Sequence, residues 1–273
     1  MPISDSRAKS HGGDTAAVDL TLWGPSSAGK TVFLAQLYIE SENGGGEWDV
    51  FPTTESLEFI REMRSRMAAT NHFPGATSVG MVERIVYRFL HRATGREISL
   101  VMEDRAGKDF EELEESAQSV LAAAAGLVLL FDPMRPAATL EREVWDTLES
   151  IHVASDRGAR KDDRPIAVCL SKADLLLRTS ADLERARVEP DAFVRERVGA
   201  SLLRALDRFC SDYRLFPVSA AGVRTRFGVI EPLVFFDEQL DPRICPEDGR
   251  PFNLMAPFTW LFDRLLARRE TRR

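Results

Sequence analysis

The feature that most constrains this chain is the pattern G-x-x-x-x-G-K-T, which runs from Gly24 to Thr31. This spacing is typical of a phosphate-binding loop (Walker A), because its glycines let backbone N–H groups approach the phosphates closely. In such a loop Lys30 reaches the β- and γ-phosphates of a nucleotide, and the Thr31 hydroxyl is a ligand of Mg²⁺. The residues expected to contact the nucleotide here are Gly24, Ser27, Ala28, Gly29, Lys30, Thr31 and Val32.

The residues on either side of the loop fit the strand–loop–helix context that this motif requires. Apolar and polar residues alternate over 18–22, which is typical of a half-buried strand. After the loop, Leu34, Leu37 and Tyr38 recur at helical spacing. The phosphates are therefore expected at a helix N-terminus, where free N–H groups and the helix dipole favour anions.

Strands and helices alternate along the rest of the chain. We expect strands at 84–90, 96–104, 125–133, 164–174 and 213–220. We expect helices at 55–69, at 108–124, from about 134 to 157, at 182–213 and at 254–266. The first two strands are joined by a short turn and form a hairpin. The pattern predicts an α/β fold of the P-loop NTPase type, with a doubly wound, mainly parallel sheet, one antiparallel hairpin strand and helices on both faces.

The length and composition favour one large α/β domain. The chain has 273 residues, of which 44% are hydrophobic, and this is enough for a sizeable core. Residues 1–16 are polar and rich in Gly and Ser, so we expect a disordered tail there. We expect residues 17–273 to form a single domain with insertions near 41–76 and 224–253.

Charge and cysteine content exclude several classes of protein. The net charge of −7 argues against a broad nucleic-acid interface. Cys169, Cys210 and Cys245 are odd in number and far apart, so they indicate neither a disulfide framework nor a zinc site, and a reducing cytoplasm fits best. No apolar run reaches membrane-spanning length, and the N-terminus has no apolar signal core.

Asp104-x-x-Gly107 follows one of the expected apolar strands. In a nucleotide site Asp104 would hold Mg²⁺, usually through water, and the Gly107 N–H would contact the γ-phosphate. Two other interpretations remain open, namely a simple turn after an edge strand and a generic ATPase motif in which Glu103 activates water.

Ser171-Lys172-Ala173-Asp174 follows a second buried strand. The Asp174 carboxylate can accept both N1–H and N2–H₂ of guanine, a donor pair that adenine lacks, and the Lys172 stem can lie along the base. A capped helix N-terminus is an equally plausible interpretation of this motif.

Ser219-Ala220 follows the last expected strand, where the Ala220 N–H could meet guanine O6. Ser219 and Ala220 form a weak signal by themselves.

The four motifs occur in order, each after its own strand, as a nucleotide site at one edge of an α/β sheet requires. The set resembles the guanine-nucleotide motifs of Ras-like, translation-factor-related GTPases (the TRAFAC class) over about residues 18–222 and the closing helix. The stretches GPSSAGKTVFLAQLY, FPGATS, EDRAGKDF and PFTWLFDRLL resemble more specifically bacterial double-GTPase domains. The resemblance implies binding of GTP or GDP together with Mg²⁺.

The chain departs from the Ras-like pattern at three points. Ser171 stands where asparagine or threonine usually precedes the lysine, which weakens the expected preference for guanine. Lys108 stands where a glutamine generally orients the attacking water, so it is either a catalytic cation or a solvent-exposed side chain. Thr77 is our choice for the effector-loop threonine that contacts Mg²⁺, with Thr53 and Thr54 as alternatives.

These observations predict a GTP-binding molecular switch with slow GTP hydrolysis, in which Lys30 and Lys108 are the candidate catalytic residues. Such a switch would act on a protein effector or respond to a protein activator. A nucleotide-binding interaction module without significant turnover is the first alternative. An ATPase or small-molecule kinase is the second, and the arginine-rich segment 178–208 leaves room for the arginine-bearing lid that a kinase needs.

Overall fold

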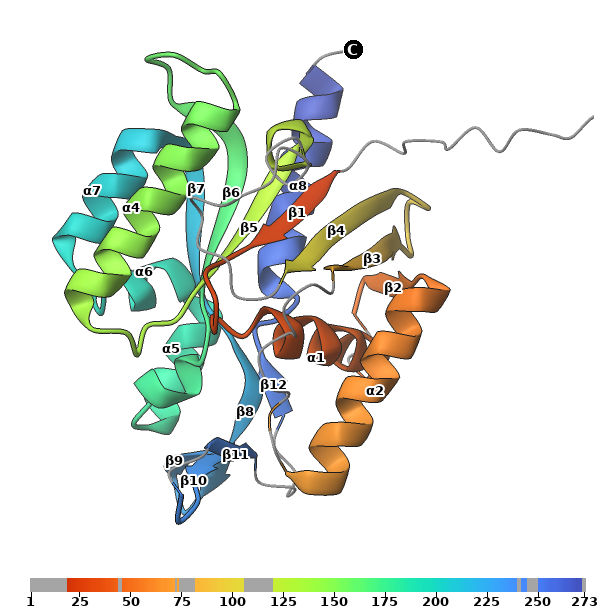
Figure 1. The fold of residues 1–273 in the computed structure, drawn as a ribbon, viewed down its shortest axis with the longest axis vertical. Coiled ribbons are helices and arrows are strands. Elements are labelled where there is room, and N and C mark those ends of the chain that lie inside the picture. Colours follow the sequence, from red (N-terminus) through yellow and green to blue (C-terminus); the bar gives the residue numbers. More distant parts are fainter. Residues whose placement is uncertain are drawn as a thin grey trace, which may run out of the picture.

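A computed structural model describes residues 19–43, 46–71, 73, 82–105, 120–239, 242–244 and 250–271. Within these residues the main sheet has seven strands in the order β2-β3-β4-β1-β5-β6-β7 (Figure 1). The strands are β2 (Trp48–Pro52), β3 (Val82–His91), β4 (Glu97–Arg105), β1 (Leu20–Trp23), β5 (Gly126–Phe131), β6 (Asp162–Leu170) and β7 (Cys210–Pro217). The predicted α/β fold is confirmed.

β1 lies at the centre of the sheet. Leu20 pairs with Leu100 of β4 on one side and with Gly126 of β5 on the other, and both pairings are parallel. β5, β6 and β7 continue the parallel arrangement. The carboxyl ends of these strands therefore meet at one edge of the sheet, where an α/β fold forms its ligand site.

β3 is the predicted antiparallel hairpin strand, and it pairs with β4 and β2. β2 was not predicted. It is only five residues long and follows a glycine-rich stretch, although Trp48 and Val50 are buried while Phe51 is exposed. That alternation is the ordinary strand signal, but it is too short to stand out from the surrounding loop.

Helices cover both faces of the sheet (Figure 1). α1 (Lys30–Asn43), α2 (Thr54–Thr70) and α8 (Ala256–Thr271) pack on one face, and α4 (Ala137–Ala154) and α7 (Ala200–Phe209) pack on the other. The buried strand β5 shows how the faces divide, because Val128 and Leu130 join the first core whereas Leu127, Leu129 and Phe131 join the second.

The long helical region predicted over roughly 182–213 is divided into three helices and ends earlier than predicted. The structure has α5 (Ser180–Val188), α6 (Pro190–Arg195) and α7 there, and residues from Cys210 onward belong to β7. Pro190 has no N–H to donate and occupies the start of α6, so it ends the preceding helix. Gly199 is the N-cap of α7 and separates it from α6.

The segment predicted as an insertion near 224–253 contributes strands to two small sheets. β8 (Ser219–Arg226) pairs with β9 (Val229–Pro232) and β12 (Arg250–Phe252), and β10 (Val234–Phe236) pairs with β11 (Pro242–Ile244). In Figure 1 these strands lie below the main sheet, near α5. The predicted tail at 1–16 and most of the predicted helix at 108–124 lie outside the described residues.

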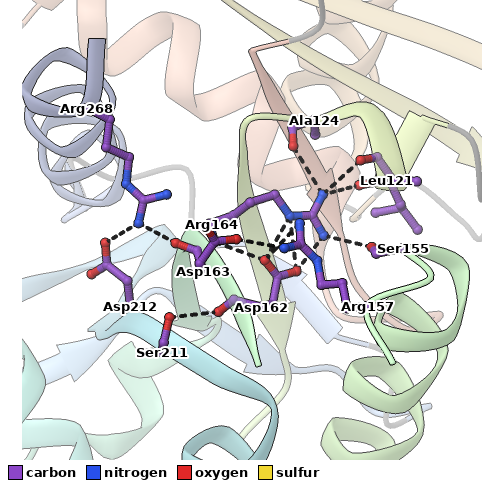
Figure 2. Close-up of polar contacts among 11 residues, drawn as sticks. Leu121, Ala124, Ser155, Arg157, Asp162, Asp163, Arg164, Ser211, Asp212 and Arg268 are labelled. Carbon is purple, nitrogen blue, oxygen red and sulfur yellow. Dashed lines mark hydrogen bonds and ion pairs between the residues drawn. The ribbon is translucent and has the colours of Figure 1, made fainter. Parts of the chain in front are cut away.

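A buried arginine joins several elements near the amino end of β6, away from the edge where the carboxyl ends of the parallel strands meet. The Arg164 guanidinium of β6 forms an ion pair with Asp162 at 2.6 Å and donates to the carbonyls of Leu121 (2.5 Å) and Ala124 (3.1 Å). Figure 2 shows the guanidinium between these groups, with the Ser155 hydroxyl on the same side. Arg164 thus connects β6 to the backbone that leads into β5.

A second arginine ties the closing helix to the sheet. Arg268 of α8 pairs with Asp212 of β7 at 3.0 Å and also donates to the Asp163 carbonyl of β6 (Figure 2). None of the helices in the described ranges is both long and apolar enough to cross a membrane.

Candidate nucleotide-binding site

The predicted phosphate loop lies between β1 and α1, as the motif requires. Gly24 approaches β5 so closely that a Cβ atom built on it would lie 2.3 Å from the Leu130 carbonyl oxygen. Gly29, just before α1, has a φ of +84°, a conformation that side chains with a Cβ rarely adopt. Both glycines of the motif are therefore required by the backbone path and not merely tolerated.

The side chains of the loop are arranged around the start of α1. The Lys30 ammonium donates to the carbonyls of Gly24 (2.9 Å) and Pro25 (3.0 Å), so it lies against the loop. Ala28 is buried, and the Phe33 N–H donates to the Gly29 carbonyl, which closes the first turn of the helix. Lys30, Thr31 and Val32 thus occupy the first turn, where the helix presents its free N–H groups.

The predicted base motif lies at the carboxyl end of β6, at the same edge of the sheet. Asp174 is the second residue of a short 3₁₀ helix, η2 (Ala173–Leu176), and is 1% exposed. Its Oδ1 accepts a hydrogen bond from the Ser219 hydroxyl at 2.5 Å, whereas its Oδ2 is buried and has no hydrogen-bond partner in the described part of the chain.

The environment of Asp174 disfavours its charged form. Burial raises the pKa of this carboxyl above its ordinary value, and the hydrogen bond from Ser219 only partly opposes that effect. Ser219 Oγ in turn accepts the Gly222 N–H at 2.8 Å, which fixes the hydroxyl so that it donates to Asp174. A buried acceptor that lacks a donor is costly in a folded protein, so Asp174 Oδ2 marks a place where a ligand donor fits.

The motif after β6 and the motif after β7 contact each other through their backbones. The Ala173 N–H donates to the Val218 carbonyl at 3.1 Å, and the Val218 N–H donates to the Leu170 carbonyl at 2.8 Å. The structure therefore brings Asp174 and Ser219 together, and their contacts with a guanine base stay a prediction. Ala220 is half-buried at the start of β8, and its contact with guanine O6 stays a prediction.

Ser171 and Lys172 are both engaged within the protein. The Ser171 hydroxyl donates to the Phe131 carbonyl at 3.0 Å, so it joins the ends of β5 and β6. Lys172 adopts a φ of +50° and its ammonium contacts the Asp132 carboxylate at 2.5 Å. That ion pair was not predicted, although Asp132 directly follows a buried strand and this position is a usable signal for a site residue.

Several predicted site residues lie outside the described part of the chain. These are Thr77, Gly107 and Lys108, together with the side chain of Asp104, which is the penultimate residue of β4. Of the two alternative threonines, Thr53 has a hydroxyl that contacts Ser56 Oγ at 2.9 Å at the start of α2, while Thr54 is exposed. Among the described residues, no group of three or more His, Cys, Asp or Glu side chains could hold a metal ion by itself.

The chain is similar in part to several solved structures. The bacterial selenocysteine-specific elongation factor EF-Sec is 16% identical over 75% of this chain and 26% of its own, with a TM-score of 0.39. The GTPase-like domain of Ski7 from S. cerevisiae, bound to GDP and inorganic phosphate, is 16% identical over 74% of this chain and 43% of its own, with a TM-score of 0.46. A GTP-binding protein from the archaeon Sulfolobus solfataricus, in complex with GDP, is 13% identical over 75% of this chain and 47% of its own, with a TM-score of 0.39. The chain thus spans less than half the length of each.

Comparison of sequences identifies a family. No curated protein matches the chain significantly. A sequence model of the Double-GTPase 2 family, however, matches residues 20–233, which include the phosphate loop, the base motif and Ser219. Family membership supports binding of GTP, in agreement with the motifs that the structure brings to one edge of the sheet. The chain belongs to the Double-GTPase 2 family.

Proposed function

We propose that the chain is a guanine-nucleotide switch that binds GTP with Mg²⁺ and hydrolyses GTP slowly. The observation that carries the proposal is Asp174 Oδ2, which is buried, has no hydrogen-bond partner among the residues that the structure describes, and lies at the same sheet edge as the phosphate loop. A site for a nucleotide needs a phosphate cradle and a selective base contact, and these two features supply them.

Asp174 favours guanine over adenine by hydrogen-bond polarity. Guanine presents N1–H and N2–H₂ side by side, and the carboxylate can accept both because Oδ2 is free and Oδ1 has a second lone pair. Adenine would present the unprotonated N1 to a carboxylate, which leaves two acceptors facing each other in a buried site. Two donors to the ionised carboxylate would also offset the burial that disfavours its charge.

The phosphate loop has the groups that a nucleoside triphosphate and Mg²⁺ require. Lys30 would exchange its carbonyl contacts for the β- and γ-phosphates, and free N–H groups at the start of α1 would cradle the same phosphates. Thr31 would hold Mg²⁺ directly and Asp104 would hold it through water, and bound Mg²⁺ would offset phosphate charge. In the proposed reaction, water attacks the γ-phosphorus in line, the bond to the β–γ bridging oxygen breaks, and GDP and phosphate leave.

The kinase alternative receives no support from the arginines of the segment 178–208. Arg185, Arg195 and Arg197 pair with carboxylates of their own segment at 2.6–2.9 Å. These pairs lie within and between α5, α6 and the residues that follow α6, so each of these three guanidinium groups already has a local carboxylate partner. The interaction-module alternative differs from a switch only in turnover, so it is separated by kinetics.

A competition experiment tests the base assignment. Labelled GTP is displaced by unlabelled GTP, ATP and xanthosine triphosphate from the wild type, from Asp174→Asn and from Asp163→Asn, an exposed aspartate that serves as the control. We expect the wild type to prefer GTP, and we expect Asp174→Asn to lose GTP affinity and to gain relative affinity for xanthosine triphosphate, which has a carbonyl at position 2. Equal binding of ATP and GTP by the wild type would rule out the guanine site.

Single-turnover hydrolysis tests the switch. Slow but measurable release of phosphate, together with a protein that binds only the GTP-loaded form, is the expected result. Complete absence of turnover, alone and with added cell extract, would favour an interaction module that binds nucleotide without hydrolysing it.

A further inference from the structure

The turn after β5 contacts both the phosphate loop and the base motif of the candidate nucleotide site. It runs over residues 132–135, and the Arg135 N–H donates to the Asp132 carbonyl at 3.2 Å, which closes the turn. Asp132 is 7% exposed. Asp132, at one end of the turn, contacts Lys172 of the base motif, and Arg135, at the other end, contacts Ser26 of the phosphate loop. Neither Asp132 nor Arg135 is part of a motif that was predicted from the sequence.

At its first residue the turn anchors Lys172. Asp132 Oδ2 accepts the Lys172 ammonium at 2.5 Å, and Asp132 Oδ1 accepts the Met134 N–H at 2.9 Å. The second bond holds the carboxylate in one orientation from within its own turn. The Lys172 side chain is 41% exposed, and a lysine loses much rotamer freedom when it is held in one position, so a fixed anion is needed to keep its ammonium in place.

At its last residue the turn contacts the phosphate loop. Arg135 Nη2 donates to the Ser26 carbonyl at 3.3 Å, and Arg135 Nε lies 3.6 Å from Glu143 Oε1 of α4. The turn is therefore held against the phosphate loop from one side and against α4 from the other. Asp132 consequently has a fixed position relative to the loop that would bind the phosphates.

We propose that Asp132 is a positioning residue for the guanine nucleotide, which acts by holding Lys172 beside the base-binding carboxylate of Asp174. The inference rests on the proposed function, because Lys172 and Asp174 meet the base only if a guanine nucleotide binds here. In this proposal Asp132 acts on the nucleotide only through its ion pair with Lys172.

The test compares Asp132→Asn with the wild type in equilibrium titrations with fluorescent GTP and GDP. Asparagine keeps an oxygen for the Met134 N–H but loses the charge that holds the ammonium, so the turn is retained while the anchor is lost. We expect affinity to fall about tenfold, and by the same factor for GTP and GDP, because the lost anchor acts on the base and not on the γ-phosphate. Glu196→Gln, which removes an exposed ion pair with Arg185, is the matched control and should leave both affinities unchanged.

A double-mutant cycle separates positioning from a general structural role. In a Lys172→Met background, Asp132→Asn should cause no further loss of affinity, whereas a structural role of Asp132 would persist there. If Asp132→Asn lowers the melting temperature, the Lys172→Met variant still tests the ion pair, because Lys172 is its more exposed member. Lys172→Met must then lower the affinities for GTP and for GDP about tenfold.

Two outcomes would refute the role of Asp132 and leave the proposed function intact. The first is unchanged nucleotide affinity in Lys172→Met, and the second is an equal loss of affinity from Asp132→Asn in the wild-type and Lys172→Met backgrounds. If the wild type binds no guanine nucleotide, the proposed function fails and the inference fails with it.

Discussion

Replacement of Arg164 by methionine should lower the free energy of unfolding by about 4 kcal/mol, because it removes an ion pair with Asp162 and hydrogen bonds to two backbone carbonyls. The substitution keeps an unbranched apolar chain but removes a guanidinium whose side chain is 7% exposed. Asp162, whose side chain is 4% exposed, would lose its ion pair, and removing one partner of a buried pair costs about 3–5 kcal/mol. Asp162 would keep two partners, the Arg157 guanidinium at 3.3 Å and the backbone N–H of residue 164 at 2.9 Å, so the loss of the ion pair should cost about 3 kcal/mol, the lower end of this range.

The backbone carbonyls add to this cost. Leu121 and Ala124 would each lose a charged donor, and an unpaired buried carbonyl costs about 1 kcal/mol or more. These costs overlap with the first because one guanidinium serves all three groups. A loss of about 4 kcal/mol is a large share of the roughly 5–15 kcal/mol that holds a typical domain together.

Urea unfolding followed by circular dichroism measures the loss. Arg185→Met, which removes an exposed pair with Glu196, should leave the free energy of unfolding close to that of the wild type and serves as the control. The double variant Arg164→Met with Asp162→Asn should recover part of the stability, because the uncompensated charge is gone. A loss below about 1 kcal/mol in Arg164→Met, or no recovery in the double variant, would refute the reasoning that the cluster is desolvated.

Four further predictions concern the nucleotide site. Lys30→Ala should weaken GTP binding by about 2–3 kcal/mol, measured by titration with labelled GTP, and unchanged affinity in a folded variant would remove the basis for the phosphate loop. Gly24→Ala should lower both the melting temperature and GTP affinity, because its Cβ would lie 2.3 Å from the Leu130 carbonyl oxygen. GTP affinity should fall as pH is lowered through the pKa of Asp174, because only the ionised carboxylate accepts both guanine donors and burial has raised that pKa; this loss should be absent in Asp174→Asn. Single-turnover hydrolysis should proceed at roughly 10⁻⁴ s⁻¹ or below and be accelerated in Lys108→Gln, whereas a fast wild type that slows in Lys108→Gln would identify Lys108 as a catalytic cation.

The elements with a strong local signal could be predicted from the sequence. The strand, loop and helix around Gly24 and Lys30 were predicted because glycine spacing and apolar periodicity agree there. The strands β5 and β6 were predicted because β5 and the second half of β6, residues 166–170, are continuous apolar runs. The meeting of Asp174 and Ser219 followed from topology, since parallel strands end at the same edge of the sheet.

The features that the sequence did not reveal depend on tertiary contacts or on very short patterns. β2 has only five residues, and its strand conformation is decided by pairing with β3 and by burial of Trp48. The division of 182–213 into helices was missed because charged, helix-favouring residues outweighed Pro190 in the pattern. The pairing of Asp132 with Lys172 joins residues 40 positions apart, and no local pattern encodes such a contact.

The backbone link between the loops after β6 and β7 has a consequence for protein engineering. The hydrogen bonds from Ala173 to Val218 and from Val218 to Leu170 use main-chain atoms only, so they persist whatever side chains the two loops carry. Asp174 and Ser219 are thus displayed on a frame that is held in part by bonds independent of their side chains. A library that varies these two positions would sample new base preferences while its members keep these main-chain bonds between the two loops.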